Sequence, residues 1–336
     1  MATKAEELAK IESLLAAADS DLGTAGSVFS FSLSGGFEAF DTTATFALFN
    51  RGLRARVAVH QDDWDAAQDA LDACSAWATS SDPNEGVYHV FSSGANDQDN
   101  EMYEDPTATT IKLVIHPTFY TDAEAGDSRV SDNVVVRADT IVYDGLESYL
   151  APSLYASSYD PVPIMRAEEL QLLQAEVHIG NGDYSDAETI MNAIRTAAGV
   201  ADYSGTDASN AVDRVLHEKR YSLFLEGHRL VDMRHYGKTG DLPLDRPERG
   251  DSIVTFPIPE TETPGQDSFI NQQQKRPQSR PLLFYGEKED TMRKFTLISF
   301  TFIWVLSAQN SETDKLVKGL LGDTPIEEDL QELCDV

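Results

Sequence analysis

The densest group of ionisable side chains in the sequence lies between residues 212 and 237. Within it, His228, Asp232 and His235 follow one another at intervals of four and three residues, so a continuous helix would carry all three on one face. Imidazole and carboxylate groups are common ligands of metal ions. However, the HExxH spacing of a catalytic zinc helix is absent. We therefore predict no metal site and no cofactor.

Other catalytic signatures are also missing from the chain. The sequence contains no G-x-S-x-G nucleophile turn, no phosphate-binding P-loop and no G-x-G-x-x-G dinucleotide loop. Glycoside hydrolysis requires two carboxylates that face one sugar, but a chain with 57 acidic residues brings acids together by chance. We predict that the protein is not an enzyme.

The charges in residues 212–237 favour a structural role. Apolar residues recur there at helical spacing, and a glycine in the middle of such a run costs about 1 kcal/mol relative to alanine, which predicts a break. We expect the charged side chains to hold one helix against another rather than to touch a ligand. The residues assigned to this structural motif are Glu218, Arg220, Glu226, Gly227, Arg229, Asp232 and Arg234.

The elements that position this motif are helical. Residues 53–67 match residues 173–187 at an offset of 120, with Trp64 corresponding to Tyr184 and Ala67 to Ala187. Each copy predicts a helix, a short polar turn and a second helix, as in a tetratricopeptide hairpin. We predict an all-α fold in which such hairpins form a superhelical scaffold, with Trp64 and Tyr184 in equivalent buried positions.

The region between the two copies has a different composition. Residues 79–163 are rich in turn-forming residues, and short strands are predicted at 87–91, 111–115 and 134–136. The predicted organisation is a helical hairpin at 42–78, a loop-rich insert at 79–163, a second hairpin at 164–199 and C-terminal helices at 208–237.

The sequence changes character again near its C-terminal end. Residues 266–291 are polar and are interpreted as a linker. Residues 292–336 begin with Met292, two basic residues and an apolar run, which is typical of a secretory signal peptide. We interpret this segment as the start of a separate exported protein. The alternative is an apolar C-terminal helix of the same domain.

Two stretches resemble the RagB/SusD family of outer-membrane nutrient-binding lipoproteins. The family's last helices read roughly E-R-x-x-E-L-x-x-E-G-x-R-x-x-D-L-x-R-W-G, followed by F-P-I-P. The counterparts here are the structural motif above, with Tyr236 in place of Trp, and residues 256–259. Before the second hairpin, Arg166 and Glu169 match a further family pattern. The resemblance covers residues 1–265 and implies a chain that is incomplete at its N-terminus.

The resemblance also implies a function and a location. It implies a surface-exposed lipoprotein of the outer membrane, although this chain contains neither a signal peptide at its start nor a lipidated cysteine. Such a protein would bind oligosaccharide and deliver it to a TonB-dependent transporter. The alternative is a soluble tetratricopeptide-like adaptor that binds a partner protein. A net charge of −31 argues against nucleic acid, because phosphate binding requires clustered Lys and Arg.

The insert supplies side chains suited to an oligosaccharide. Sugar rings stack on aromatic faces, and their hydroxyl groups hydrogen-bond to polar side chains in a concave site. We select Tyr149, Tyr155 and Tyr159 as ligand-binding candidates, because they cluster just before the second hairpin at irregular spacing. The alternative role for each ring is to anchor a loop on the helical scaffold.

Overall fold

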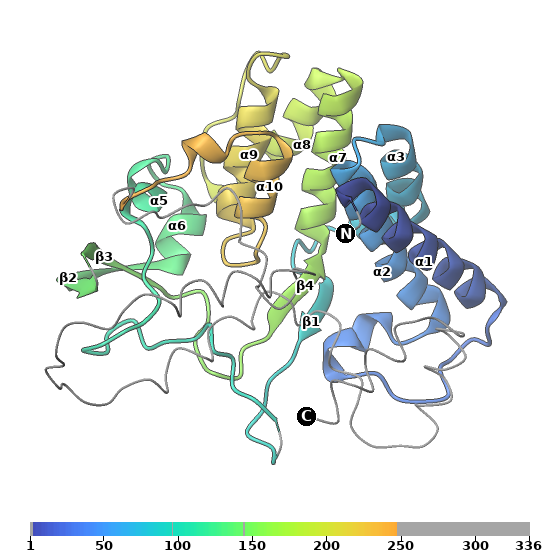
Figure 1. Cartoon of the computed structure of the whole chain (residues 1–336), viewed down its shortest axis with the longest axis horizontal. Coiled ribbons are helices and arrows are strands. Elements are labelled where there is room, and N and C mark those ends of the chain that lie inside the picture. The colour runs from blue at the N-terminus through green and yellow to red at the C-terminus, as the bar shows by residue number, and fades with distance from the viewer. Residues whose placement is uncertain (1–2, 96, 144, 247–336) are drawn as a thin grey trace, which may run out of the picture. The chain divides into compact units, whose positions relative to one another are not determined.

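Helices dominate the described part of the chain, and the predicted helical fold class is confirmed (Figure 1). The computed structural model describes residues 3–95, 97–143 and 145–246. The predicted linker at 266–291 and the signal-peptide-like segment at 292–336 therefore lie outside the described residues. The main helices are α1 (Lys4–Thr24), α2 (Thr43–His60), α3 (Trp64–Ala73), α4 (Ser75–Ala78), α7 (Ala167–Asn181), α8 (Tyr184–Ala198), α9 (Ala211–Ser222) and α10 (Arg229–His235).

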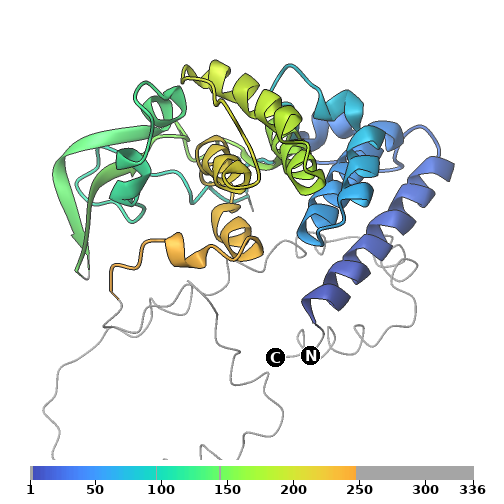
Figure 2. The same ribbon diagram turned by 90° about the horizontal axis from the view of Figure 1, so that it is seen from above.

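The helices lie side by side in chain order. From α1 the row continues through α2 and α3, then α7 and α8, and then α9 with α10 packed against it (Figures 1 and 2). The insert leaves the row after α4 and returns at α7. Much of it, including the short helices α5 (Pro117–Thr121) and α6 (Ser128–Asn133), lies beyond α9, on the side of the row away from α1 (Figure 2).

The strands are few and short, and all pair antiparallel. Strand β1 (Gly86–His89) pairs with β4 (Val162–Arg166), and β2 (Val134–Tyr143) pairs with β3 (Leu146–Pro152). Two details of the sequence prediction are wrong. Residues 111–115 form no strand, and residues 164–166 extend β4, so α7 begins only at Ala167. Pairing with β1 holds these residues extended, a long-range contact that local propensity does not report.

The two helical hairpins have equivalent turns. Asp62 in the first and Gly182 in the second stand at corresponding positions, and both adopt a left-handed backbone, with φ of 57° and 84°. Asp63 then caps α3, because its carboxylate accepts a hydrogen bond from the amide of Ala66 at 3.1 Å. Gly182 reaches this conformation without the steric cost that Asp62 bears.

Small residues allow the hairpins to pack closely. Ala67 and Ala187 are both completely buried at the helix crossings. Trp64 and Tyr184 are half-buried at equivalent positions, so neither ring is as deeply buried as predicted. Trp64 lies directly against α7, where a Cβ atom added to Gly180 would be 2.3 Å from its indole ring. The aromatic ring of the first hairpin therefore fills space that the glycine of the second leaves open.

Three groups of buried side chains form the core. The first joins α2, α3 and the start of α7 around Phe40 and Trp77. The second lies between α7, α8 and α9, and includes Met191 and Val215. The third attaches the insert to α9, where the ring of Tyr221 packs against the insert. Burial of this last group places the insert's loops beside the C-terminal helices.

The run of residues 212–237 is broken into two helices. Helix α9 ends at Ser222 and α10 begins at Arg229. In the loop between them, Leu225 and Gly227 have φ angles of 63° and 83°. Both values lie in the left-handed region, which a right-handed helix cannot include. The break predicted at Gly227 is therefore present, and Phe224 and Glu226 lie in the loop between the two helices.

Among the described residues, no helix combines the length and the apolar character needed to span a lipid bilayer.

Candidate functional site

A buried ion-pair network joins the insert to the C-terminal helices. The carboxylate of Glu218 on α9 is completely buried, and each of its oxygens binds a different arginine. Its Oε2 accepts from Arg129 of the insert and its Oε1 from Arg195 of α8, both at 2.7 Å. Tyr203 donates a further hydrogen bond to Oε1 at 2.7 Å. Asp127 holds the other edge of Arg129.

A second network lies between α7, α9 and α10. The buried ammonium group of Lys219 is 3.0 Å from Glu176 and 2.7 Å from Asp232. Burial acts to lower the pKa of Lys219, but the two carboxylates outweigh it and raise that pKa. Burial raises the pKa of Asp232 to about 6 despite the attraction of Lys219. Tyr236 donates to the other oxygen of Glu176 at 2.9 Å.

The remaining residues of the structural motif have varied surroundings. Arg220 pairs with Asp122 of the insert at 2.9 Å. Arg229 donates to the backbone carbonyl of Leu216 at 3.1 Å. Arg234 is exposed. The contacts described for Arg220 and Arg229 thus join parts of the chain, as the sequence interpretation expects.

The histidine stripe that first suggested metal chemistry has separate partners. Nε2 of His228 lies 3.8 Å from Glu169, whereas Asp232 binds Lys219. The ring of His235 lies 3.4 Å from Asp62. In the described ranges, no three His, Cys, Asp or Glu side chains are grouped so as to hold a metal ion.

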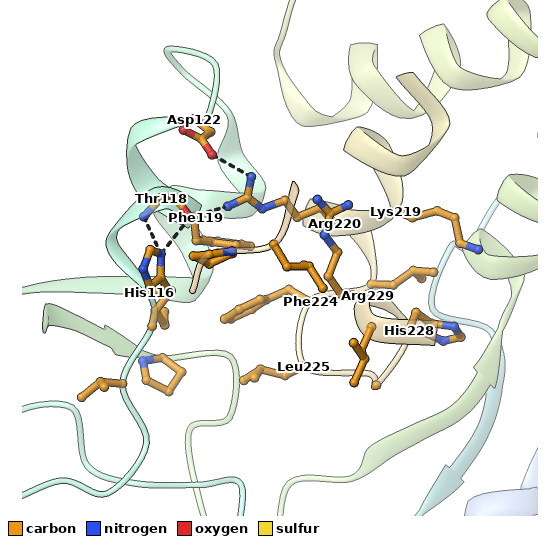
Figure 3. Close-up of a pocket in the computed structure, with 18 of the residues that line it drawn as sticks. His116, Thr118, Phe119, Asp122, Lys219, Arg220, Phe224, Leu225, His228 and Arg229 are labelled. Atoms are coloured by element: carbon orange, nitrogen blue, oxygen red, sulfur yellow. Dashed lines mark hydrogen bonds and ion pairs between the residues drawn. The ribbon is translucent and has the colours of Figure 1, made fainter. Parts of the chain in front are cut away.

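Two clefts open between the insert and the C-terminal helices. The first has a volume of about 550 Å³, and we call it the apolar cleft (Figure 3). Phe119, Phe224 and Leu225 contribute apolar surface to its walls. On one side, Arg220 reaches Asp122, as the dashed line in Figure 3 shows. Some of its charged side chains are thus occupied with each other, and apolar side chains cover much of its walls.

The second cleft has a volume of about 510 Å³, and we call it the polar cleft. Three tyrosines contribute to its walls: Tyr88 of β1, Tyr155 of the loop after β3 and Tyr221 of α9. Asn84 and Asp132 add polar groups from two other segments of the insert. The loop between α9 and α10 closes another side with Glu226. Residues far apart in sequence thus combine flat aromatic surface with hydrogen-bonding groups.

The hydroxyl of Tyr155 is the unusual group in this cleft. The residue is only 6% exposed, and its Oη atom is buried without a hydrogen-bond partner among the described residues. Burial raises the pKa of Tyr155 to about 12, so the hydroxyl keeps its proton at neutral pH. An unpaired buried hydroxyl costs free energy.

Charged groups on another wall of the polar cleft are held in place by one another. Arg166 at the end of β4 binds Glu226 at 2.9 Å and also pairs with Glu168. A further hydrogen bond connects Arg166 to the carbonyl of Ser222, at the end of α9. Burial raises the pKa of Glu226 to about 7, although Arg166 acts in the opposite direction.

The three candidate tyrosines lie in different environments. Tyr149 is half-buried and packs against the core of the insert. Tyr155 lines the polar cleft, and Tyr159 is 48% exposed. Tyr88 of β1 and Asn84 of the turn before it line the same cleft, and neither was a sequence-predicted candidate. The strand predicted at 87–91 contains Tyr88, so the sequence offered a signal for this aromatic residue. The local sequence carried no signal that the strand pairs with β4.

Comparison with known proteins identifies a family model that matches part of the chain. A model of the SusD family matches residues 151–308, of which the part after residue 246 lies outside the described residues. The match covers just under half of the chain, and the similarity to the SusD family applies to those residues. No curated protein sequence matches the chain.

Solved structures of similar proteins share low sequence identity with the chain. A SusD superfamily protein from Bacteroides fragilis has 15% identity and a TM-score of 0.48, with 64% of this chain and 62% of that chain covered. A laminarin-binding SusD-like protein has 17% identity and a TM-score of 0.46, with 73% and 64% covered. Surface glycan-binding protein A from Bacteroides uniformis has 16% identity and a TM-score of 0.45, with 68% and 58% covered. The chain thus spans about three fifths of the length of these structures.

Proposed function

We propose that this protein binds oligosaccharide in the polar cleft, as a non-enzymatic nutrient-binding protein of the outer-membrane surface. The observation that carries the proposal is that tyrosine rings, among them Tyr88 and Tyr155, line one cleft together with polar side chains such as Asn84 and Asp132. The match of residues 151–308 to the SusD family supports a binding role rather than catalysis.

The residues of the cleft match the chemistry of a sugar. The weakly apolar face of a sugar ring stacks on an aromatic side chain. Tyr88 and Tyr155 supply such rings, and the hydroxyl of Tyr88 is fixed by donating to the carbonyl of Asn84. Asn84 and Asp132 also line the cleft, where the amide and the carboxylate can form hydrogen bonds with ligand hydroxyls. The apolar cleft offers fewer groups of this kind.

The place of this binding step in nutrient uptake rests on the family match. We infer that the protein is a surface-exposed lipoprotein that passes its ligand to a TonB-dependent transporter of the outer membrane. Co-purification tests the partner directly. The tagged protein, expressed in a bacterium that makes the transporter, should retain the transporter after detergent extraction. Absence of the transporter from such preparations would remove this part of the proposal and leave glycan binding to be judged separately.

Glycan binding itself is tested by affinity electrophoresis and calorimetry. The protein is screened against laminarin, amylopectin and galactomannan, and any glycan that binds is titrated into the Tyr88→Ala and Tyr155→Phe variants. Loss of the ring of Tyr88 should weaken binding by roughly 1 kcal/mol. Tyr155→Phe keeps the ring and tests whether the hydroxyl, which is buried in the free protein, contributes to binding.

The control is Tyr159→Ala, which removes an exposed ring that does not line the polar cleft. Because Tyr159 was itself a sequence-predicted candidate, this variant also separates the two placements of the site. Unchanged affinity in the Tyr88 and Tyr155 variants, with weakened binding in Tyr159→Ala, would move the site out of the polar cleft.

A further inference from the structure

The polar cleft contains two guanidinium groups, and internal carboxylates neutralise both. Arg129 lies between Asp127 and Glu218, with nitrogen–oxygen distances of 2.7 Å to each. Arg166 is paired with Glu226 and Glu168. Neither arginine therefore offers an uncompensated positive charge to a ligand in the cleft.

Two further carboxylates at this cleft have no such compensation. Asp160 accepts hydrogen bonds from the hydroxyl of Ser157 at 2.7 Å and from the amide of Ala156 at 2.6 Å. These bonds hold the pKa of Asp160 below its usual range, so the group is ionised. Asp132 is exposed, and no cation among the described residues forms an ion pair with it. The polar cleft therefore carries more negative than positive charge.

We propose that the polar cleft selects neutral saccharides and rejects anionic ones such as uronates, with Asp132 as a specificity-determining residue. This inference rests on the proposed glycan site and names its ligand class. A sugar carboxylate entering the cleft would approach the carboxylate of Asp132 and, among the described lining residues, find both guanidinium groups already paired. Neutral hydroxyls can donate hydrogen bonds to the same carboxylate oxygens. The net charge of −31 on the chain adds to the repulsion of an anionic glycan at low salt.

The test compares each glycan with its own oxidised form. Laminarin, amylopectin and galactomannan are titrated by calorimetry before and after oxidation of their primary hydroxyls to carboxylates. At low ionic strength the oxidised form should bind at least about tenfold more weakly than its neutral parent. Because salt screens exposed charges, the difference should shrink as salt is raised.

Variants of two exposed aspartates identify the source of the selectivity. The Asp132→Asn variant should bind the oxidised glycan about threefold more tightly than the parent protein does, on the scale of one screened charge pair. The ratio of its affinities for the neutral and the oxidised glycan should therefore fall relative to that of the parent protein. Asp69 on α3 is also exposed but lies outside the cleft, so Asp69→Asn provides the matched control and should change neither affinity.

Each outcome bears on a different claim. Equal or tighter binding of the oxidised glycan by the parent protein would overturn the selectivity while leaving the glycan site in place. Equal gains from Asp132→Asn and Asp69→Asn would assign the repulsion to overall charge and overturn the role of Asp132. If no glycan binds in either form, the proposed function fails, and the selectivity fails with it.

Discussion

The guanidinium of Arg129 lies 2.7 Å from the carboxylate of Glu218, although the two residues are 89 positions apart in the sequence. Arg129 belongs to the insert and Glu218 to the middle of α9. The other oxygen of Glu218 binds Arg195 of α8. One buried carboxylate therefore ties the insert, which supplies most of the polar cleft, to two helices of the scaffold.

This arrangement predicts a large effect of neutralising Glu218. The Glu218→Gln variant keeps the size of the side chain but leaves the charges of Arg129 and Arg195 facing a neutral amide. Removing one partner of a buried ion pair typically costs about 3–5 kcal/mol of stability. We expect a lower melting temperature and a lower urea midpoint, measured by circular dichroism.

The matched control is Glu147→Gln, because Glu147 is an exposed glutamate on β3. The free energy of unfolding of this variant should lie within about 0.5 kcal/mol of that of the parent protein. Equal stability of the two variants would show that Glu218 does not hold the insert to the scaffold.

Packing between the two hairpins can be tested at Gly180. A methyl group added there would lie 2.3 Å from the indole of Trp64, so the ring must move. We expect Gly180→Ala to destabilise the protein by roughly 1–3 kcal/mol, the usual cost of overpacking. Gly23 near the end of α1 has no neighbouring atom within 4 Å of an added Cβ. Gly23→Ala should be neutral or stabilising, since alanine favours a helix. Similar melting of both variants would contradict close packing at Gly180.

The pKa of Glu226 predicts a pH dependence of stability. Burial raises this pKa from 4.5 to about 7, so the folded protein binds a proton that the unfolded chain releases between these values. The contribution of Glu226 is therefore fully present below about pH 4.5 and is lost as pH rises through 7. Relative to the parent protein, Glu226→Gln should gain stability on the order of 2 kcal/mol between pH 5 and pH 8.

Urea denaturation of both proteins at several pH values measures this difference. Burial also raises the pKa of Asp232 to about 6. Because both proteins contain Asp232, its contribution to the pH dependence of stability cancels in the comparison. A difference that stays constant from pH 5 to pH 8 would show that Glu226 titrates near its ordinary pKa.

The hydroxyl of Tyr155 should contribute little to the stability of the fold. Because it is buried without a described partner, Tyr155→Phe should leave the melting temperature unchanged or raise it. Tyr221 provides the contrast, since its hydroxyl donates to the carbonyl of Phe119 at 3.2 Å. Tyr221→Phe should lower stability by about 1 kcal/mol. Differential scanning calorimetry compares the two, and a clear loss of stability in Tyr155→Phe would show that its hydroxyl is already bound.

The sequence by itself determined much of the helical scaffold. The match at an offset of 120 places the turns of the two hairpins at equivalent positions, where Asp62 and Gly182 both adopt positive φ. Gly227 indicated the break between α9 and α10 for a similar reason. These features depend on residues within a few positions of one another, and local backbone preferences therefore reveal them.

Only the tertiary structure decided which residues share the polar cleft. Tyr88 and Tyr155 lie on the same cleft, whereas Tyr159, much closer to Tyr155 in sequence, does not line it. The pairing of β1 with β4 and the Arg129–Glu218 ion pair join segments of the chain that are far apart. Such long-range pairings depend on how the whole chain packs, and the local pattern around each residue carries no record of its distant partner.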